Sequence, residues 1–141
     1  MIIRGYFHQD RTPFIDVLLE IQDYKIRRKV SFLIDTGSPI TILSERDARK
    51  LKLNFSKLKP ANDNIMGLGG FAETYILNRI ILHFFTKTSM IDVPLKELFV
   101  YKNVAKDEDI VNQIPSLLGR DVLKEFSLTY DERDNNISLK R

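Results

Sequence analysis

The sequence predicts a mainly β protein that forms a single domain over residues 1–141. Apolar stretches of strand length, such as residues 13–21 and 79–85, recur along the chain, and turn-forming residues separate them. The length of 141 residues fits one domain, at about 150 residues per domain. Hydrophobic residues make up 43% and charged residues 29%, which is the composition of a globular protein with a buried core.

Several classes of chemistry are disfavoured by composition. The chain has no cysteine, which excludes disulfides, thiol catalysis and thiolate metal sites. Its two histidines, His8 and His83, lie far apart and do not have the spacing of metal ligands. We therefore expect neither a metal nor a cofactor, and we do not expect a triad that depends on histidine.

Charge and hydropathy also limit the expected partners. The net charge is only +3, and the one compact basic run, residues 27–29, has no interleaved aromatic residues, so we expect no nucleic-acid partner. No apolar run approaches the roughly 20 residues of a membrane helix. Arg4 brings charge too early for a signal peptide, so we expect a cytoplasmic protein with no membrane partner.

The first elements expected are two strands, at residues 13–21 and 25–34, joined by a turn at 22–24. The second strand ends in three large apolar residues, which indicates that it runs into a buried centre. Residues 35–39 break this strand, and residues 40–43 resume an extended run.

A helix is expected to begin at Ser44, because the sequence up to Asp47 resembles a capping box with Asp in place of Glu or Gln. We expect this helix to end near residues 53–54. Residues 60–64 then read as a loop, and residues 65–77 as a hairpin with a glycine-rich tip.

The second half of the chain continues with strands and short connections. We expect strands at 79–85, 96–101 and 116–119, an exposed loop at 102–113, one or two helical turns at 120–126, and a final hairpin of strands 127–130 and 137–140.

The segment that indicates chemistry is Asp35-Thr36-Gly37-Ser38, directly after the apolar residues 32–34. A carboxylate in this position is costly to bury unless it has partners. Thr36 and Ser38 supply hydroxyls, and Gly37 lets a backbone N–H approach the carboxylate. The alternative is that Asp35 only caps a turn, for which Asp-Thr-Gly is also suited.

Three segments in the same order resemble the retropepsin-like aspartic proteases. They are the Asp-Thr-Gly motif within residues 33–43, the glycine-rich residues 67–71, and an apolar-apolar-Gly element followed by Arg and a short helix at 117–123. The resemblance covers residues 13–140. Its last part, residues 123–139, is more similar to cellular and prokaryotic members than to viral ones.

This resemblance implies a closed β-barrel with a flap hairpin and one or two short helices. It also implies an aspartic endopeptidase that needs no cofactor and cleaves an extended peptide or protein substrate. Two carboxylates share one proton in such enzymes, and they titrate as a pair. Because this chain has a single Asp-Thr-Gly, the resemblance implies an obligate homodimer in which each subunit contributes Asp35 as the catalytic residue.

The supporting residues receive roles by the same resemblance. Thr36 is expected to hydrogen-bond across the dimer, and Gly37 to offer its N–H to the carboxylates. We expect the Ser38 hydroxyl to donate to the Asp35 carboxylate and so extend activity to lower pH. The expected flap and substrate-binding residues are Met66, Gly67, Leu68, Gly69, Gly70 and Phe71.

The second apolar-Gly element consists of Leu117, Leu118, Gly119, Arg120 and Asp121. The family's arginine at the position of Arg120 often pairs with an acid just beyond Asp-Thr-Gly, and here Pro39 and Ile40 stand there instead. Three acids are candidates for its partner: Asp121, Asp47 and Glu45. The alternative is that Asp121 begins a helix, where negative charge is favourable, and that both residues are structural.

Other interpretations stay open for the flap and for the whole chain. The glycine-rich tip is also compatible with a plain hairpin turn. The apolar residues of the three segments can belong to the core rather than to substrate pockets. The alternative function is a non-catalytic module of the same fold that dimerises or binds extended peptides.

Overall fold

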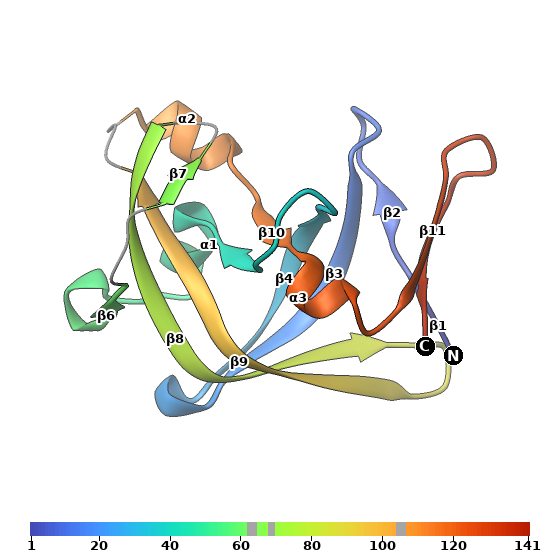
Figure 1. Cartoon of the computed structure of the whole chain (residues 1–141), viewed down its shortest axis with the longest axis horizontal. Coiled ribbons are helices and arrows are strands. Elements are labelled where there is room, and N and C mark those ends of the chain that lie inside the picture. Colours follow the sequence, from blue (N-terminus) through green and yellow to red (C-terminus); the bar gives the residue numbers. More distant parts are fainter. Residues whose placement is uncertain (62–64, 68–69, 104–106) are drawn as a thin grey trace.

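The computed structural model describes residues 1–61, 65–67, 70–103 and 107–141, with side chains described for all of these except 65–67 and 70–72. The fold is mainly β (Figure 1). The strands are β1 (Ile2–Arg4), β2 (Tyr6–Phe7), β3 (Pro13–Ile21), β4 (Ile26–Ile34), β5 (Ile42–Leu43), β6 (Lys59–Pro60), β7 (Ile65–Gly67), β8 (Gly70–Phe85), β9 (Met90–Asn103), β10 (Ser116–Leu118), β11 (Ser127–Asp131) and β12 (Asn136–Lys140).

The helical segments are short. They are the 3-10 helices η1 (Gln22–Tyr24) and η2 (Phe55–Lys57) and the α-helices α1 (Glu45–Lys50), α2 (Glu108–Gln113) and α3 (Arg120–Leu123). Within the described residues, none of these helices has the length and apolar character needed to cross a membrane.

Six strands close into a barrel, in the order β3, β4, β10, β5, β9, β8 and back to β3. The β3–β4 hairpin pairs Ile21 with Ile26. The strand β10 runs parallel to β4, and β5 runs parallel to β9. The antiparallel pairing of β8 with β3 closes the ring. The ring is completed through short contacts on the other side, because β10 pairs only with residues 32–34 of β4 and β5 pairs only with residues 99–100 of β9.

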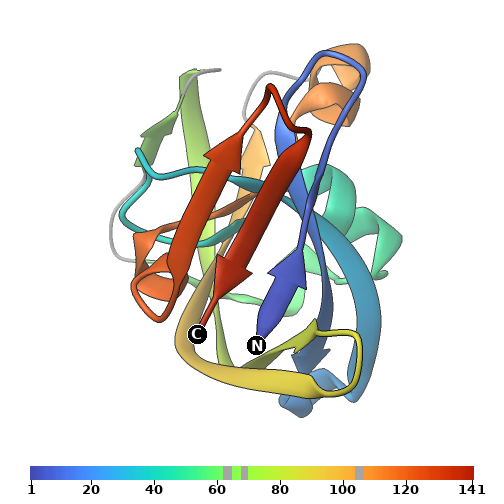
Figure 2. The ribbon, with the colours of Figure 1, turned by 90° about the vertical axis from the view of Figure 1, so that its right-hand side faces the viewer.

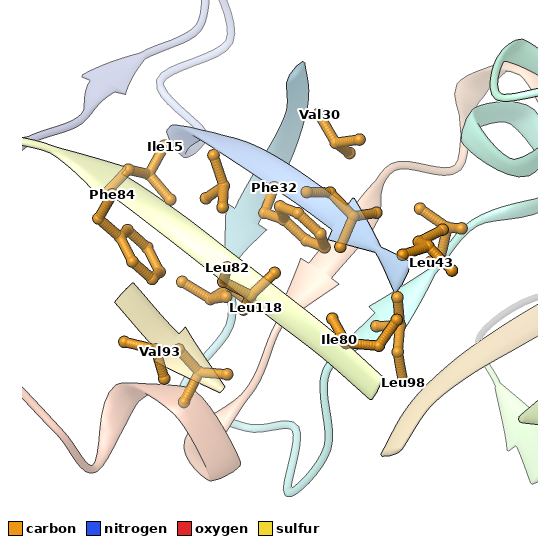
Figure 3. Close-up of a cluster of buried hydrophobic side chains, with 14 of the residues drawn as sticks. Ile15, Val30, Phe32, Leu43, Ile80, Leu82, Phe84, Val93, Leu98 and Leu118 are labelled. Carbon is orange, nitrogen blue, oxygen red and sulfur yellow. The ribbon is translucent and has the colours of Figure 1, made fainter. Parts of the chain in front are cut away.

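Alternation along the strands fills the barrel. In β3 the residues Ile15, Val17, Leu19 and Ile21 are all completely buried, whereas their neighbours are partly exposed. Side chains from β3, β4, β8, β9 and β10 meet in one cluster (Figure 3). Burial of one such aliphatic or aromatic side chain contributes about 1.5–3 kcal/mol, so this cluster is the main source of stability.

The strand β8 differs from the expected hairpin followed by a separate strand. It is one strand of 16 residues that pairs with β9 along most of its length. Its first half also pairs with β6, and residues 80–83 pair with β3. Arg79 has a φ of 59° between these two regions, in the left-handed region. The prediction of two separate elements was wrong. The backbone distortion at Arg79 changes the neighbouring strand of β8 from β6 to β3, but β8 continues through it.

Three further expectations differ from the structure. Residues 107–113 are not simply a loop, because α2 forms there with Asp107 as N-cap, accepting from the Asp109 N–H. The helix α1 ends at Lys50, earlier than expected, and the extended run after the Asp-Thr-Gly loop is limited to β5.

The two ends of the chain lie together in a second, three-stranded sheet in the order β1, β12, β11 (Figure 2). Ile3, Ile137 and Leu139 from this sheet are buried. Gly5 joins β1 to β2, and a Cβ there would lie 2.5 Å from the carbonyl oxygen of Phe14. The close approach of the two backbones therefore requires glycine.

Candidate active site

The expected catalytic residue Asp35 directly follows β4 and lies at the start of a tight loop. Its backbone N–H donates to the Leu118 carbonyl at 3.0 Å. The Gly37 N–H donates to the Asp35 carboxylate Oδ1 at 3.0 Å, and the Ser38 N–H donates to the Asp35 carbonyl at 3.2 Å. Asp35 is partly exposed, and Thr36 and Gly37 are exposed. The loop thus presents one carboxylate, oriented by a backbone N–H, at the surface of the chain.

The segment after β10 holds this loop through two hydrogen bonds. The Arg120 N–H donates to the Ser38 carbonyl at 2.8 Å, and the Arg120 Nη1 atom donates to the Thr36 carbonyl, also at 2.8 Å. Arg120 therefore binds the backbone of the loop. Among the described residues, none of the three candidate acids, Asp121, Asp47 and Glu45, forms an ion pair with Arg120, and its backbone contacts agree with the structural interpretation.

Asp121 instead holds the far end of the loop. Its two carboxylate oxygens accept the N–H and the hydroxyl of Thr41, at 3.0 and 2.6 Å. The Thr41 hydroxyl oxygen in turn accepts the Gly119 N–H at 3.1 Å. Asp121 lies in the first turn of α3, as the structural interpretation of this residue expected.

Ser38 does not contact the carboxylate that we expected it to bind. Its Oγ atom donates to the carbonyl oxygen of Ile40 at 2.6 Å, and its side chain is largely buried. This hydroxyl closes the loop locally. The expected hydrogen bond from Ser38 to the Asp35 carboxylate is absent from the described contacts.

The predicted flap corresponds to the hairpin of β7 and β8. Its register pairs Ile65 with Ala72, Met66 with Phe71 and Gly67 with Gly70. Leu68 and Gly69, which we expected at the tip, lie outside the described residues. This hairpin and the loop after β4 lie at the same end of the barrel (Figure 1).

The apolar residues near the loop divide between the core and the surface. Ile34, Ile42 and Leu118 are buried and belong to the barrel. Ile40 and Leu117 are partly exposed. The interpretation as core residues therefore holds for the first three.

Sequence reasoning missed a group of buried polar residues beside the loop. Ser44, Asp47 and Ser116 are nearly inaccessible and hydrogen-bond one another. Glu45 is 4% exposed, and its carboxylate accepts the Asn103 N–H at 2.7 Å and an Arg49 N–H. A serine and an acid at a helix start carry an ordinary capping signal, so nothing in the local sequence distinguished these as buried.

Arg49 also binds Glu108, the first residue of α2, at 2.6 Å. This hydrogen bond and the charge of the guanidinium lower the pKa of the Glu108 carboxyl. The pKa of Arg49 is raised, with the hydrogen bond to Glu108 as the main cause. The ion pair therefore connects α1 to α2 at the end of β9.

The arrangement can supply one carboxylate, with its orientation fixed, to a reaction. In the part of the chain that is described, no three histidine or acidic side chains gather in a way that would hold a metal ion. The sequence has only one Asp-Thr-Gly, so a single chain supplies one carboxylate of this kind.

Comparison with known proteins identifies the fold. A model of the aspartyl protease family matches residues 18–122. A retropepsin-like aspartic protease from Rickettsia conorii superposes with a TM-score of 0.59 at 20% identity, covering 99% of this chain and 88% of that one. EIAV protease, complexed with the inhibitor HBY-793, superposes with a TM-score of 0.50 at 20% identity, covering 84% of this chain and 91% of that one. No curated protein sequence matches the chain.

The barrel, the Asp-Thr-Gly loop and these similarities define a retropepsin-like aspartyl protease fold. The chain belongs to the aspartyl protease family.

Proposed function

We propose that the chain is an aspartic endopeptidase that works as a homodimer, with Asp35 of each subunit at a shared active site. The observation that carries this proposal is the Asp35 carboxylate itself. Asp35 is partly exposed, its carboxylate accepts the Gly37 N–H at 3.0 Å, and its backbone N–H donates to the Leu118 carbonyl of β10. Membership of the aspartyl protease family supports the same chemistry.

The proposed reaction begins with the addition of water to a peptide carbonyl. One Asp35 carboxylate accepts a proton from the water as the oxygen attacks the carbonyl carbon, and the other Asp35 carboxyl donates a proton to the carbonyl oxygen, which gives a tetrahedral diol. The diol then returns a proton to the ionised carboxylate as the carbon–nitrogen bond breaks, and the leaving nitrogen takes its proton from the protonated carboxyl. Two carboxylates in contact do not both ionise readily, so the pair holds one proton between them. A substrate in extended conformation would add strand-like hydrogen bonds to the β7–β8 hairpin, which we propose as the flap.

The first experiment measures cleavage of denatured protein and of a peptide library from pH 3 to pH 7. Asp35→Asn should abolish cleavage and leave the mass in light scattering unchanged. Asp134→Asn is the matched control, because it changes an exposed aspartate in the turn between β11 and β12, and it should leave cleavage unchanged. Cleavage by Asp35→Asn at the wild-type rate would contradict the proposal.

A mixing experiment tests whether two chains share one site. When equal amounts of wild-type and Asp35→Asn chains exchange freely, about one quarter of the dimers carry both carboxylates. We therefore expect about a quarter of the activity that the same total concentration of wild-type chains gives. A value of about one half would mean that each chain works alone.

A further inference from the structure

A buried carboxylate joins helix α1 to the beginning of β10. The Asp47 Oδ2 atom accepts the Ser116 hydroxyl at 2.6 Å and lies 3.2 Å from the Ser44 hydroxyl. The Ser44 N–H donates to Ser116 Oγ at 2.9 Å. Asp47 is 7% exposed, Ser44 2% and Ser116 0%. A carboxylate that is withdrawn from water to this degree needs such donors.

These contacts exceed what the capping of α1 requires. The Ser44 hydroxyl accepts the Asp47 N–H at 3.3 Å, which is one half of the expected capping box. The other half would be a hydrogen bond from the Ser44 N–H to the Asp47 carboxylate, but that N–H donates to Ser116 instead. The Asp47 carboxylate accordingly binds a strand that lies 69 positions further along the chain.

Among the residues that the structure describes, Arg46 is the cationic neighbour of the Asp47 carboxylate. The Arg46 Nε atom lies 3.5 Å from Asp47 Oδ1, and it is buried without a hydrogen-bond partner among the described residues. The Arg46 Nη1 atom donates to the carbonyl oxygen of Asn112, at the end of α2. The Arg46 guanidinium therefore lies close enough to offset the negative charge of Asp47, and α2 holds the guanidinium in place.

The three-residue strand β10 connects this network to the candidate catalytic loop. The strand β10 consists of Ser116, Leu117 and Leu118, and it lies parallel to β4 with Ser116 opposite Phe32. The carbonyl oxygen of Leu118 accepts the Asp35 N–H at 3.0 Å. The strand is so short that the hydrogen bonds of Ser116 act together with the pairing to β4 and β5 in placing the Leu118 carbonyl.

We propose that Asp47 is a positioning residue for Asp35. Through Ser116 it fixes β10, and β10 fixes the backbone of Asp35 through the Leu118 carbonyl. The effect on catalysis rests on the proposed function, whereas the effect on the position of the loop does not.

The test is hydrogen exchange of the Asp35 amide, measured by NMR in the full chain. We expect Asp47→Ala and Ser116→Ala each to speed this exchange at least about tenfold, while the amides of the β11–β12 hairpin keep their rates. Because the two residues act through one contact, the double variant should exchange no faster than the more affected single variant. Ser116→Thr keeps the hydroxyl and should stay near the wild-type rate.

Glu45→Ala is the matched control. Glu45 lies on the same helix and its side chain is equally buried, but its carboxylate binds Asn103 of β9 and Arg49 rather than β10. It should leave the Asp35 amide at the wild-type rate. If an alanine variant fails to fold, Ser116→Cys provides the same readout, since a thiol has nearly the same shape and is a weaker donor.

Two results would overturn the proposal. One is an Asp35 amide that exchanges at the wild-type rate in the Asp47 and Ser116 variants. The other is a uniform acceleration of all amides, which would mean that Asp47 only stabilises the whole chain. If cleavage is measurable, the variants should lower kcat and leave KM unchanged. If the wild-type chain does not cleave peptides at all, the proposed function fails while the exchange experiment still tests the role of Asp47.

Discussion

The Asp35 N–H donates to the Leu118 carbonyl at 3.0 Å, directly beyond the last register pair of β4 and β10, Ile34 and Leu118. The next residue, Gly119, lies against the other end of the same loop. A Cβ on Gly119 would lie 2.3 Å from the carbonyl oxygen of Ile40. The candidate catalytic loop and the apolar-Gly element therefore pack as one unit, with backbone against backbone.

Gly119→Ala should destabilise the chain by about 3 kcal/mol, because the added methyl group meets backbone that cannot move aside without breaking the loop. Denaturation in urea measures this loss as a shift of the midpoint at an unchanged slope.

Gly37→Ala is the matched control for this prediction. The Cβ that it adds would meet only the Asp35 carboxylate, at 3.2 Å. We expect it to cost less than about 1 kcal/mol and to disturb the Asp35 carboxylate rather than the fold. Equal losses in the two variants would show that close packing of Gly119 is not the cause.

Ser38→Ala should lower stability by about 1 kcal/mol, because it removes a largely buried hydrogen bond to the Ile40 carbonyl. It should not move the acid limb of the pH–rate profile, because the hydroxyl does not reach the Asp35 carboxylate in this structure. Thermal unfolding and the pH–rate profile of the variant check the two parts. A shift of the acid limb would restore the interpretation based on the sequence alone.

The sequence predicted those strands in which buried and exposed positions alternate, or which turn-forming residues end abruptly. The bounds of β3 were predicted to the residue, because Pro13 and Gln22 enclose a regular alternation of buried and partly exposed positions. The strand before Asp35, the short strand β10 and the final hairpin were also expected. Two of these elements carry the candidate site, because the strand before Asp35 leads into the Asp-Thr-Gly loop and β10 leads into the apolar-Gly element.

The remaining differences depend on contacts between distant parts of the chain. Nothing near Arg79 indicates that β8 continues through it, since a positive φ in a strand is held by tertiary structure. The helix α2 is polar, and it is connected to α1 by Arg49 and Glu108, which are 59 positions apart. The hydrogen bond of Arg120 ends on the backbone oxygen of Thr36, and a backbone acceptor leaves no signal in a sequence.

Glu108→Gln should reduce stability slightly near neutral pH and not at all in acid. Arg49 lowers the pKa of the Glu108 carboxyl below its usual value of 4.5. A lowered pKa means that the stabilising effect is present above pH 4.5 and is lost as the pH falls through the lowered value. Because the pair is at the surface, the effect is small and decreases with salt. Urea denaturation of both proteins at neutral and strongly acidic pH measures the difference.

Asp109→Asn is the control for the Glu108 experiment, because it removes a charge from the same helical turn without removing an acceptor of Arg49. The stability difference between Asp109→Asn and wild type should depend less on salt than the difference between Glu108→Gln and wild type. If the Glu108→Gln difference persisted unchanged at strongly acidic pH, the ion pair would not be its source.

His83→Leu should destabilise the barrel by about 2 kcal/mol, because it leaves two carboxylates without their ring partner. The Nε2 atom of His83 lies 2.9 Å from the Glu20 carboxylate on β3, and the Nδ1 atom lies 2.6 Å from the Asp92 carboxylate on β9. The histidine thus connects the two strands on either side of β8, and its own side chain is 6% exposed.

The matched control is His8→Leu. The His8 side chain is 59% exposed and lies 3.6 Å from Asp10, so its replacement should change stability by less than about 0.5 kcal/mol. Urea denaturation of the two variants at one pH makes the comparison, and similar losses in both would mean that the contacts with Glu20 and Asp92 do not stabilise the closed barrel.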